Sequence, residues 1–423
     1  MPPVDDRRVL VVGTTPDYID DIRSRCTGQA LFLTDPALRR DAREPMPEPK
    51  EEILCDLSEA EGVVRQLADH LERWGIGLAG VACFDDESMA LAARLARDYG
   101  LPYPSMEAVA NCRDKYRSKI LWAAQGLTTP AVCKVASPEA AAAFWRTAGG
   151  PVVLKPIGGS GSELMFRCAG EADCTRHFRT IAEGLAQRQD DRLYQPCAAG
   201  APGILAEALI AGEEFSCDFV LKGGRATVLR LTRKVRFEEE PFGTAKAYSL
   251  PEDWPEALKG GGFETLLVRS AQALGIERAI GMLDFFIHDG QVVLLEMAPR
   301  PGGDCLPPLL RRCCQLDVLQ LVLDFACQKP LDRKPTASHP PMVGLRLHAP
   351  AEGTLAGIDD RELRRDPRVR EIHLTRRPGH IIKRPPADYD AWLLGHVLFV
   401  PDPRRDVAVQ CRELCGRLRI EVH

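Results

Sequence analysis

The first part of the chain, to about residue 110, alternates short apolar runs with amphipathic stretches. Arg8–Gly13 is an apolar run that ends at a glycine, and Gly80–Phe84 is a second one. Between them, Val63–Trp74 places its apolar residues at helical spacing. Further strands are expected at Gln29–Thr34 and Glu52–Leu57, and further helices at Pro16–Arg25 and Glu87–Tyr99. Because this alternation predicts a parallel sheet with helices on both faces, we expect a doubly wound α/β domain over residues 1–110.

The middle of the chain carries helices and strands in a less regular order. Helices are expected from Arg113 to Gly126 and at Pro138–Thr147, Glu171–Gln189, Phe263–Leu274 and Pro308–Ala326. Strands are expected at Gly203–Ile210, Glu214–Leu221 and Thr227–Arg233. We assign residues 111–330 to a second domain.

A proline-rich stretch separates the last part of the chain. Lys329–Pro341 holds four prolines in thirteen residues and is typical of a linker. After it, strands are expected at Met342–His348, Val369–Leu374, His380–Lys383 and Gly395–Val400, and a helix at Asp406–Arg417. These elements predict a small α+β cap over residues 331–423.

Composition excludes several classes of protein. The 423 residues are 45% apolar and 27% charged, and 55 basic against 60 acidic residues give a net charge of −5, which argues against nucleic-acid binding. No apolar run reaches the roughly 18 residues that a membrane span needs. The N-terminus passes directly into a strand without a targeting pattern. The fifteen cysteines form no CxxC motif. We therefore expect a cytoplasmic protein with reduced thiols that acts on neither nucleic acid nor membrane.

A lysine and a glycine-rich loop follow the strand that begins at Val152. In VVLKPIGGSGSELMF, Lys155 ends the apolar run and Gly158–Ser162 contains three glycines. Glycines let backbone N–H groups approach phosphates closely, and a lysine supplies a point charge between them. The lysine precedes the glycines, unlike the lysine of a Walker loop. The segment favours a polyphosphate site; the alternative is an exposed hairpin turn with a surface lysine.

Two carboxylates flank a short turn further along the chain. Asp284 and Glu296 lie on either side of His288–Gly290. A three-residue loop with Gly290 in the left-handed region predicts a bulged hairpin, in which both carboxylates point to the same face. A strict two-residue turn would place them on opposite faces. Two converging carboxylates suit octahedral Mg²⁺, with Mn²⁺ as the other candidate ion. The alternative is two unrelated charges at strand ends.

Other charged residues are candidates with plain structural alternatives. Lys115 begins the basic helix, and a surface helix carries lysines anyway. Glu207 lies inside an apolar run, and Glu214 follows shortly after Gly212. Such carboxylates need donors, which adenine and ribose supply, unless the strand is an edge that faces water. Arg300 has a planar fork that suits a phosphoryl group. Arg233, Lys234 and Arg236 either orient an anionic substrate or form a solvated charge run.

Together and in this order, these segments resemble the ATP-grasp superfamily. The motifs that carry the resemblance are CRDKYRSK, VVLKPIGGSGS, ILAEALIAGEEFS, GMLDFF and VVLLEMAPRPGG. The resemblance implies an ATP-grasp domain of two α+β subdomains over residues 111–330, with a mobile lid at about 131–205. The motif EMAPRPGG and the proline-linked cap are most similar to the carboxylate–amine ligases of this superfamily, which join amino acids or small acids to amines.

The resemblance also implies roles for individual residues. The residues implied to bind the nucleotide are Lys115, Lys155, Gly159, Ser160, Gly161, Ser162, Glu207, Ala208, Leu209 and Glu214. Within this set, Glu207 and the backbone at 208–209 would bind adenine, and Glu214 would bind ribose. Asp284 and Glu296 are implied to hold the metal, and Lys155 and Arg300 to act in catalysis, with Arg300 stabilising an acyl phosphate.

One position departs from the family pattern, which usually has asparagine two residues after the second metal carboxylate. Ala298 stands there, so a ligand of the second metal ion is missing. We expect an ADP-producing enzyme that uses ATP and Mg²⁺ to join a small-molecule acid to an amine. The alternatives are an ATP-grasp carboxylase that activates bicarbonate or formate, and a catalytically silent nucleotide-binding module. The resemblance leaves a homodimer open.

Overall fold

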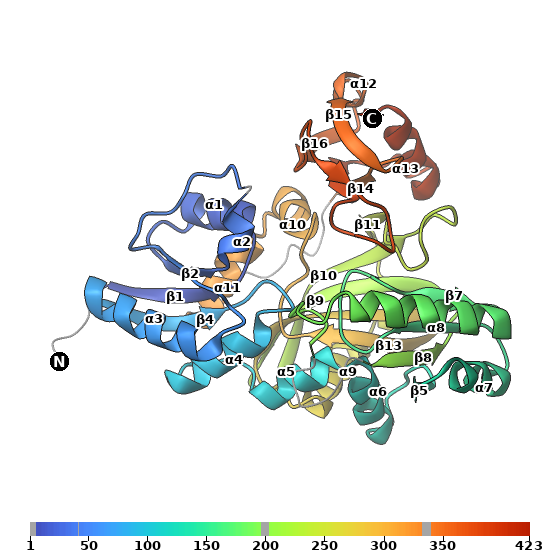
Figure 1. The fold of residues 1–423 in the computed structure, drawn as a ribbon, viewed down its shortest axis with the longest axis horizontal. Helices are drawn as coiled ribbons and strands as arrows, with labels where there is room; N and C mark the ends of the chain where they lie inside the picture. The colour runs from blue at the N-terminus through green and yellow to red at the C-terminus, as the bar shows by residue number, and fades with distance from the viewer. Residues whose placement is uncertain (1–5, 41, 196–202, 332–339) are drawn as a thin grey trace.

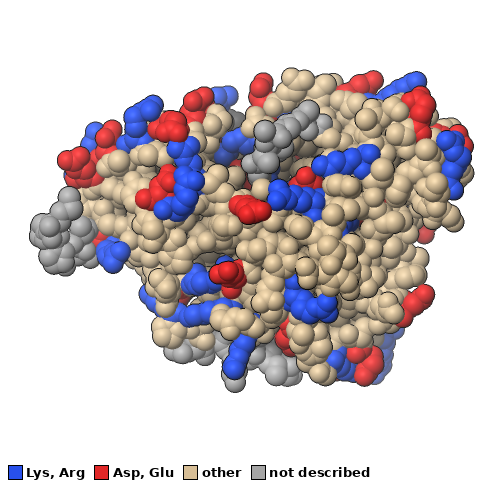
Figure 2. All heavy atoms as spheres, turned by 90° about the horizontal axis from the view of Figure 1, so that it is seen from below, with Lys and Arg blue, Asp and Glu red and all other residues tan. Residues whose placement is uncertain are grey.

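The computed structural model describes residues 6–40, 42–195, 203–331 and 340–423, whose strands form four sheets. Figure 1 shows an N-terminal layer beside a large central body, with the C-terminal segment above it. Within the described ranges no helix has the length and apolar character that crossing a membrane requires. On the face shown in Figure 2, basic and acidic side chains are interspersed and form no continuous basic surface.

The N-terminal sheet is parallel, with strand order β3-β2-β1-β4, as predicted. Its strands are β1 (Asp6–Val12), β2 (Ala30–Thr34), β3 (Glu52–Leu54) and β4 (Ile76–Ala82). The helices of this region are α1 (Pro16–Arg25), α2 (Pro36–Arg39), α3 (Ala60–Trp74) and α4 (Met89–Asp98). Apolar residues of α3 and α4 pack with Leu10 and Leu31 on one face, while Val9 and Phe32 contact the opposite core.

Two helices from the middle of the chain cover that opposite face of the N-terminal sheet. The structure divides the predicted helix Pro308–Ala326 into α10 (Leu306–Cys314) and α11 (Val318–Ala326). The break falls at Gln315, whose φ of 52° is left-handed, and Asp317 then caps α11. Gly80 allows the close approach of α11, because a Cβ there would lie 2.4 Å from the carbonyl oxygen of Ala326.

A second, antiparallel sheet has the order β5-β8-β6-β7. Its strands are β5 (Val132–Val135), β6 (Val152–Pro156), β7 (Phe166–Cys168) and β8 (Ile204–Ala208). Helices α7 (Pro138–Ala148) and α8 (Glu171–Ala186) share one apolar core with it. Ser137 caps the start of α7, and Gly149, at φ 73°, ends it. We refer to this unit as the lid sheet.

The largest sheet has eight strands in the order β13-β12-β9-β10-β11-β14-β18-β16. The strands are β9 (Glu213–Lys222), β10 (Arg225–Val235), β11 (Ala247–Leu250), β12 (Ala279–His288), β13 (Gln291–Ala298), β14 (Met342–His348), β16 (Val369–Leu374) and β18 (Leu393–Phe399). Helices α5 (Met106–Arg113), α6 (Lys115–Ala124) and α9 (Gly262–Ala273), with the short 3₁₀ helix η1 (Glu256–Leu258), contribute to the core on one face.

The C-terminal segment therefore adds three strands to the central sheet and carries a smaller sheet of its own. That sheet has the order β17-β15-β19, with β15 (Gly353–Asp359), β17 (Ile381–Ile382) and β19 (Arg419–Val422). Its helices are α12 (Arg361–Arg364) and α13 (Val407–Gly416). Most of the predicted linker Lys329–Pro341 lies outside the described residues. None of the described cysteines forms a disulfide with another described residue, and most of them are buried.

Candidate active site

A cavity of about 730 Å³ is lined by residues of the lid sheet and of the eight-stranded sheet. The predicted site residues that line it are Lys115, Lys155, Gly159, Ser160, Gly161, Ser162, Glu207, Ala208, Leu209, Glu214, Asp284 and Glu296. Segments that are almost 200 residues apart in the chain thus face the same space. Arg300 is the one predicted site residue that does not line it.

The hairpin β12–β13 places Asp284 and Glu296 on one face of the sheet, but with a different turn from the one we predicted. The three-residue loop that we predicted is wrong: His288 pairs with Gln291, so the turn has two residues, Asp289 and Gly290, with φ 47° and 74°. Positive φ at both positions is typical of a type I′ turn. The register then shifts between Asp284 and Phe285, so that Asp284 lies opposite Glu296.

The extra residue of this bulge is Leu295, within β13 and well away from the turn. Directly opposed residues of antiparallel strands project from the same face of a sheet. With a two-residue turn and no bulge, Asp284 and Glu296 would project from opposite faces of the sheet. The extra residue in β13 returns Glu296 to the face of Asp284.

Lys155 contacts a carboxylate at the end of the lid sheet. Its Nζ lies 3.0 Å from Glu207 Oε2, and the Nζ of Lys119 lies 3.1 Å from the same oxygen. Burial by itself raises the pKa of Glu207, but the two ammonium groups outweigh it and hold that pKa below its ordinary value. Burial lowers the pKa of Lys119 to about 8, with Glu207 opposing the shift. Lys119 was not among the predicted site residues, because spacing does not reveal that a helical lysine faces the core.

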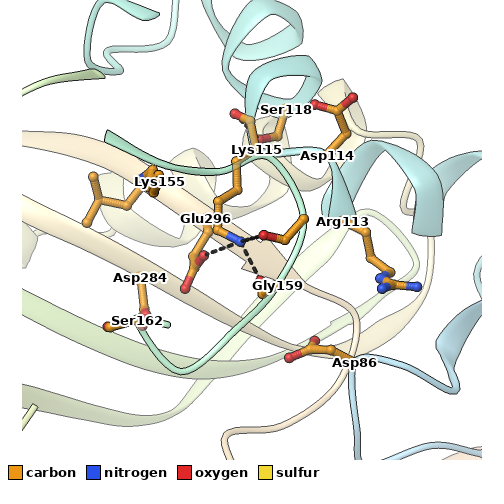
Figure 3. Close-up of polar contacts among 12 residues, drawn as sticks. Asp86, Arg113, Asp114, Lys115, Ser118, Lys155, Gly159, Ser162, Asp284 and Glu296 are labelled. Atoms are coloured by element: carbon orange, nitrogen blue, oxygen red, sulfur yellow. Dashed lines mark hydrogen bonds and ion pairs between the residues drawn. The ribbon is translucent and has the colours of Figure 1, made fainter. Parts of the chain in front are cut away.

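The glycine-rich loop is held by Lys115 and by the segment after β10. Figure 3 shows the Nζ of Lys115 between Glu296 and the loop, where it donates a hydrogen bond to the carbonyl oxygen of Gly159. The distance to Glu296 Oε2 is 3.8 Å. Ser162 donates a hydrogen bond of 2.9 Å to the carbonyl oxygen of Gly243. Gly159 has φ 90° and packs against the Tyr194 ring, so a side chain there would be both strained and crowded.

Lys234 bridges two of the predicted ligand residues. Its Nζ lies 2.5 Å from Asp284 Oδ2 and 2.9 Å from Glu214 Oε1, and Arg236 forms a further ion pair with Glu214. Burial lowers the pKa of Lys234, but the two carboxylates outweigh this and raise it above its ordinary value. Lys234 thus belongs to the cavity rather than to a solvated charge run.

The backbone next to Glu207 is partly engaged by protein groups. The N–H of Ala208 donates to the carbonyl oxygen of Ala131, and the N–H of Leu209 donates to that of Pro151. These two N–H groups are therefore occupied in this structure.

Comparison with known proteins agrees with this geometry. A family model for the ATP-grasp domain matches residues 148–308, and one for the L-amino acid ligase C-terminal domain 2 matches residues 346–423. The D-alanine–D-alanine ligase of Ralstonia nicotianae is 26% identical over 257 residues, which cover 58% of this chain and 72% of the relative. That of Aromatoleum aromaticum is 29% identical over 231 residues, which cover 53% and 69%.

The chain resembles the ATP-grasp superfamily, whose domain model matches residues 148–308.

Solved structures agree on the ATP-grasp fold. The crystal structure of the L-amino acid ligase from Bacillus licheniformis superimposes with a TM-score of 0.78 at 20% identity, covering 99% of this chain and 100% of that one. The N5-carboxyaminoimidazole ribonucleotide synthetase from Thermus thermophilus has a TM-score of 0.64 at 19% identity, covering 97% of both chains. Together with the sequence relatives, these matches support an ADP-forming ligase of the carbon–nitrogen type.

Arg300 contacts the N-terminal domain. Its Nε donates a hydrogen bond of 2.8 Å to Asp86 Oδ1, and a second guanidinium nitrogen pairs with the other oxygen of Asp86. Burial raises the pKa of Asp86, but the charge of Arg300 outweighs it and holds that pKa below its ordinary value. Asp86 follows β4 and appears below the glycine-rich loop in Figure 3. The geometry therefore places Arg300 between the domains.

A buried ion pair supports the loop that carries Arg300. Asp218 on β9 and Arg230 on β10 are cross-strand neighbours. Their side chains are fully buried and are joined by hydrogen bonds of 2.8 and 3.0 Å. Asp218 Oδ1 also accepts a hydrogen bond of 2.9 Å from the backbone N–H of Gly302. This pair ties the loop after β13 to the central sheet, and the sequence carried no local signal for it.

The residues around Asp284 fit a divalent cation of the kind that ATP-grasp enzymes use. Asp284 Oδ1 is buried without a hydrogen-bond partner among the described residues, while Oδ2 pairs with Lys234. Among the described residues, no group of three or more His, Cys, Asp or Glu side chains is arranged to hold a metal ion. Two carboxylates whose remaining positions are filled by phosphate oxygens and water suit Mg²⁺. Ala298 adds no ligand oxygen.

Proposed function

We propose that the protein is an ATP-dependent carboxylate–amine ligase that joins an amino acid or small carboxylic acid to an amine in the cytoplasm. The observation that carries the proposal is the shared cavity, in which Lys115 and Lys155 face the opposed carboxylates Asp284 and Glu296. The family model for the L-amino acid ligase C-terminal domain supports this substrate class over bicarbonate or formate.

The proposed reaction has two steps. A carboxylate oxygen of the acid attacks the γ-phosphorus of ATP, and the bond between that phosphorus and the ADP oxygen breaks. The amine nitrogen then attacks the acyl carbon, the carbon–oxygen bond to phosphate breaks, and the nitrogen loses one proton. Positioning and charge neutralisation carry such a transfer, since the protein contributes little covalent chemistry.

In this scheme each predicted site residue in the cavity has one role. Lys115 and Lys155 hold the phosphates, and the loop 158–162 closes over them. Glu207 and the backbone at 208–209 accept the adenine, and Glu214 the ribose. Asp284 and Glu296 would hold Mg²⁺, which would supply neutralisation of the phosphate charge. We further propose that residues 1–110, 111–330 and 331–423 are the domains and that residues 131–205 act as the lid, which excludes water from the acyl phosphate.

Arg300 is proposed to stabilise the acyl phosphate from the boundary between the domains. Its bidentate pair with Asp86 holds the guanidinium at this boundary, outside the lining of the cavity. A planar guanidinium can exchange a carboxylate for a phosphoryl group with the same fork geometry.

The first test is phosphate release from MgATP with panels of amino acids and amines. Release that needs both an acid and an amine supports the ligase, whereas release that needs bicarbonate supports a carboxylase. No release across the panel indicates a silent module, and AMP with pyrophosphate excludes the scheme. Lys155→Met should abolish release. Lys134→Met is the matched control, since Lys134 lies on the same sheet with a half-exposed side chain outside the cavity lining.

The second test follows one oxygen atom. With an acid labelled with ¹⁸O in its carboxylate, the acyl-phosphate route transfers one labelled oxygen to the released phosphate. Amide formation with unlabelled phosphate would refute the intermediate while leaving the ligase assignment in place. The mass of the protein in solution, measured in the same buffer, decides whether it acts as a homodimer.

A further inference from the structure

Lys119 is a fully buried lysine that the reaction scheme above does not use. Its side chain has 0% exposure, and it lies one helical turn after Lys115 on α6. Lys115 reaches into the cavity, while Lys119 points to the backbone of β13 at Leu295. A buried ammonium group is costly unless polar groups surround it, so its partners identify what it stabilises.

Among the polar contacts of Lys119 with the described residues, the shortest is with the bulge in β13. Its Nζ donates a hydrogen bond of 2.7 Å to the carbonyl oxygen of Leu295, the extra residue that shifts the register. The same nitrogen lies 3.1 Å from Glu207 Oε2 and 3.5 Å from the carbonyl oxygen of Lys115. One side chain thus connects the bulge to the carboxylate that also binds Lys155.

The position of β13 explains why the bulge needs a donor from outside the sheet. Among the described strands, β13 is an edge strand and pairs only with β12. The backbone groups of Leu294 form hydrogen bonds with the loop after α6. The N–H of Leu294 donates to the carbonyl oxygen of Thr128 at 2.9 Å, and Thr129 Oγ1 donates to the carbonyl oxygen of Leu294 at 3.1 Å. A bulged residue loses its place in the ladder, and the partly buried carbonyl of Leu295 is more stable with a donor than without one. Lys119 supplies the donor for Leu295.

The register that Lys119 supports is the one that forms the carboxylate pair. Continued without a shift from the turn, the pairing of His288 with Gln291 would place Asp284 opposite Leu295. Glu296 would then project from the other face of the sheet, because successive side chains alternate. Only the bulged register directs both carboxylates into the cavity.

We propose that Lys119 is a positioning residue that selects the bulged register of β13 and thereby keeps Asp284 and Glu296 on one face. Through Glu207 it also links this register to the part of the cavity that holds the nucleotide. The inference rests on the proposed function only in taking the two carboxylates as the metal ligands. It concerns their placement rather than the identity of the acid or the amine.

The test compares Lys119→Met with Trp122→Phe in the full-length protein. Trp122 is buried on the same helix, and its Nε1 donates a hydrogen bond of 2.9 Å to the Ser270 carbonyl oxygen, so the control perturbs the packing of α6 and keeps the hydrogen bond from Lys119 to Leu295. Free Mn²⁺ is counted by electron paramagnetic resonance during titration of each protein with saturating ADP. We expect Lys119→Met to weaken Mn²⁺ binding at least tenfold and Trp122→Phe to leave it within twofold. Amide exchange at residues 294–297 should accelerate in Lys119→Met alone.

A Lys119→Met protein that is destabilised as much as the control, but binds Mn²⁺ with unchanged affinity, would overturn the inference and leave Lys119 a core residue. Deletion of Leu295 provides a second variant that does not depend on the folding of the first. It removes the extra residue and leaves Glu296 opposite Asp284 in a ladder without a bulge, so it should keep Mn²⁺ binding and make that binding independent of Lys119. A tenfold loss of Mn²⁺ affinity when Lys119→Met is added to this deletion would likewise overturn the inference. These measurements need neither acid nor amine, so a failure of the ligase assay leaves them interpretable.

Discussion

The exchange Glu207→Gln tests how far the cavity depends on a buried carboxylate. Glu207 is 5% exposed in its side chain and balances Lys119, which is fully buried, and Lys155. Removing one partner of a buried ion pair leaves a charge without compensation, which costs about 3–5 kcal/mol. We expect a loss of stability of that size at pH 7, because glutamine keeps the shape of the side chain but not its charge.

The matched comparison is Glu296→Gln, which removes a carboxylate from the same cavity. Its side chain is 38% exposed and its ion pair with Lys115 is long, at 3.8 Å. Solvent screens such a pair, so its removal should change stability by about 0–1 kcal/mol. Glu296→Gln should nevertheless weaken metal binding, whereas Glu207→Gln should mainly weaken binding of the nucleotide.

Urea unfolding followed by tryptophan fluorescence measures both variants, with the shift of the first transition converted through its slope. The pH dependence gives a second check. Because the pKa of folded Glu207 lies below its ordinary value of 4.5, its contribution is present above that pH and is lost as the pH falls through the folded pKa. Wild type and Glu207→Gln should therefore converge in acid. Equal losses for the two variants at pH 7 would refute the argument from burial.

Three further outcomes are expected. Asp218→Asn leaves Arg230 buried without a counter-charge and should cost about 3–5 kcal/mol in urea unfolding, together with faster amide exchange at Gly302. Burial lowers the pKa of His396 to about 4, so stability should fall by about 3 kcal/mol between pH 6.5 and pH 4 as the unfolded chain alone takes up the proton; a His396→Gln variant should show a flatter acid limb. Gly290→Ala places a side chain at φ 74° and should lower stability by about 1 kcal/mol, and an unchanged melting temperature would contradict the type I′ turn.

Local pattern was sufficient for much of the architecture. Helix α1 begins and ends at Pro16 and Arg25, as its amphipathic spacing and its proline predict. The parallel order of the N-terminal sheet follows from strand–helix alternation, because parallel neighbours need a crossover between them. The interruption at Gln315, by contrast, was not visible in the apolar pattern, which continues across it.

The candidate site, too, could be predicted from local sequence only in part. Lys155 with its glycine loop, and the two carboxylates of the β12–β13 hairpin, carry their chemistry in residue type and in short spacing. The register that brings the carboxylates to one face was predicted for the wrong reason. Turn length and strand parity are local, but a bulge inside a strand depends on whether a donor elsewhere in the fold can satisfy it, and here Lys119 does so.

By itself the sequence determined which residue types stand near which turns, and therefore that the chain has a parallel N-terminal sheet and the components of an ATP site. Tertiary structure alone decided which charges meet: the pairing of Arg300 with Asp86, the bridge from Lys234 to Glu214 and Asp284, and the burial of Lys119. The reason is physical. Helix and strand periodicity depend on neighbours within a few residues, whereas the partner of a buried charge is set by the packing of segments far apart in the chain.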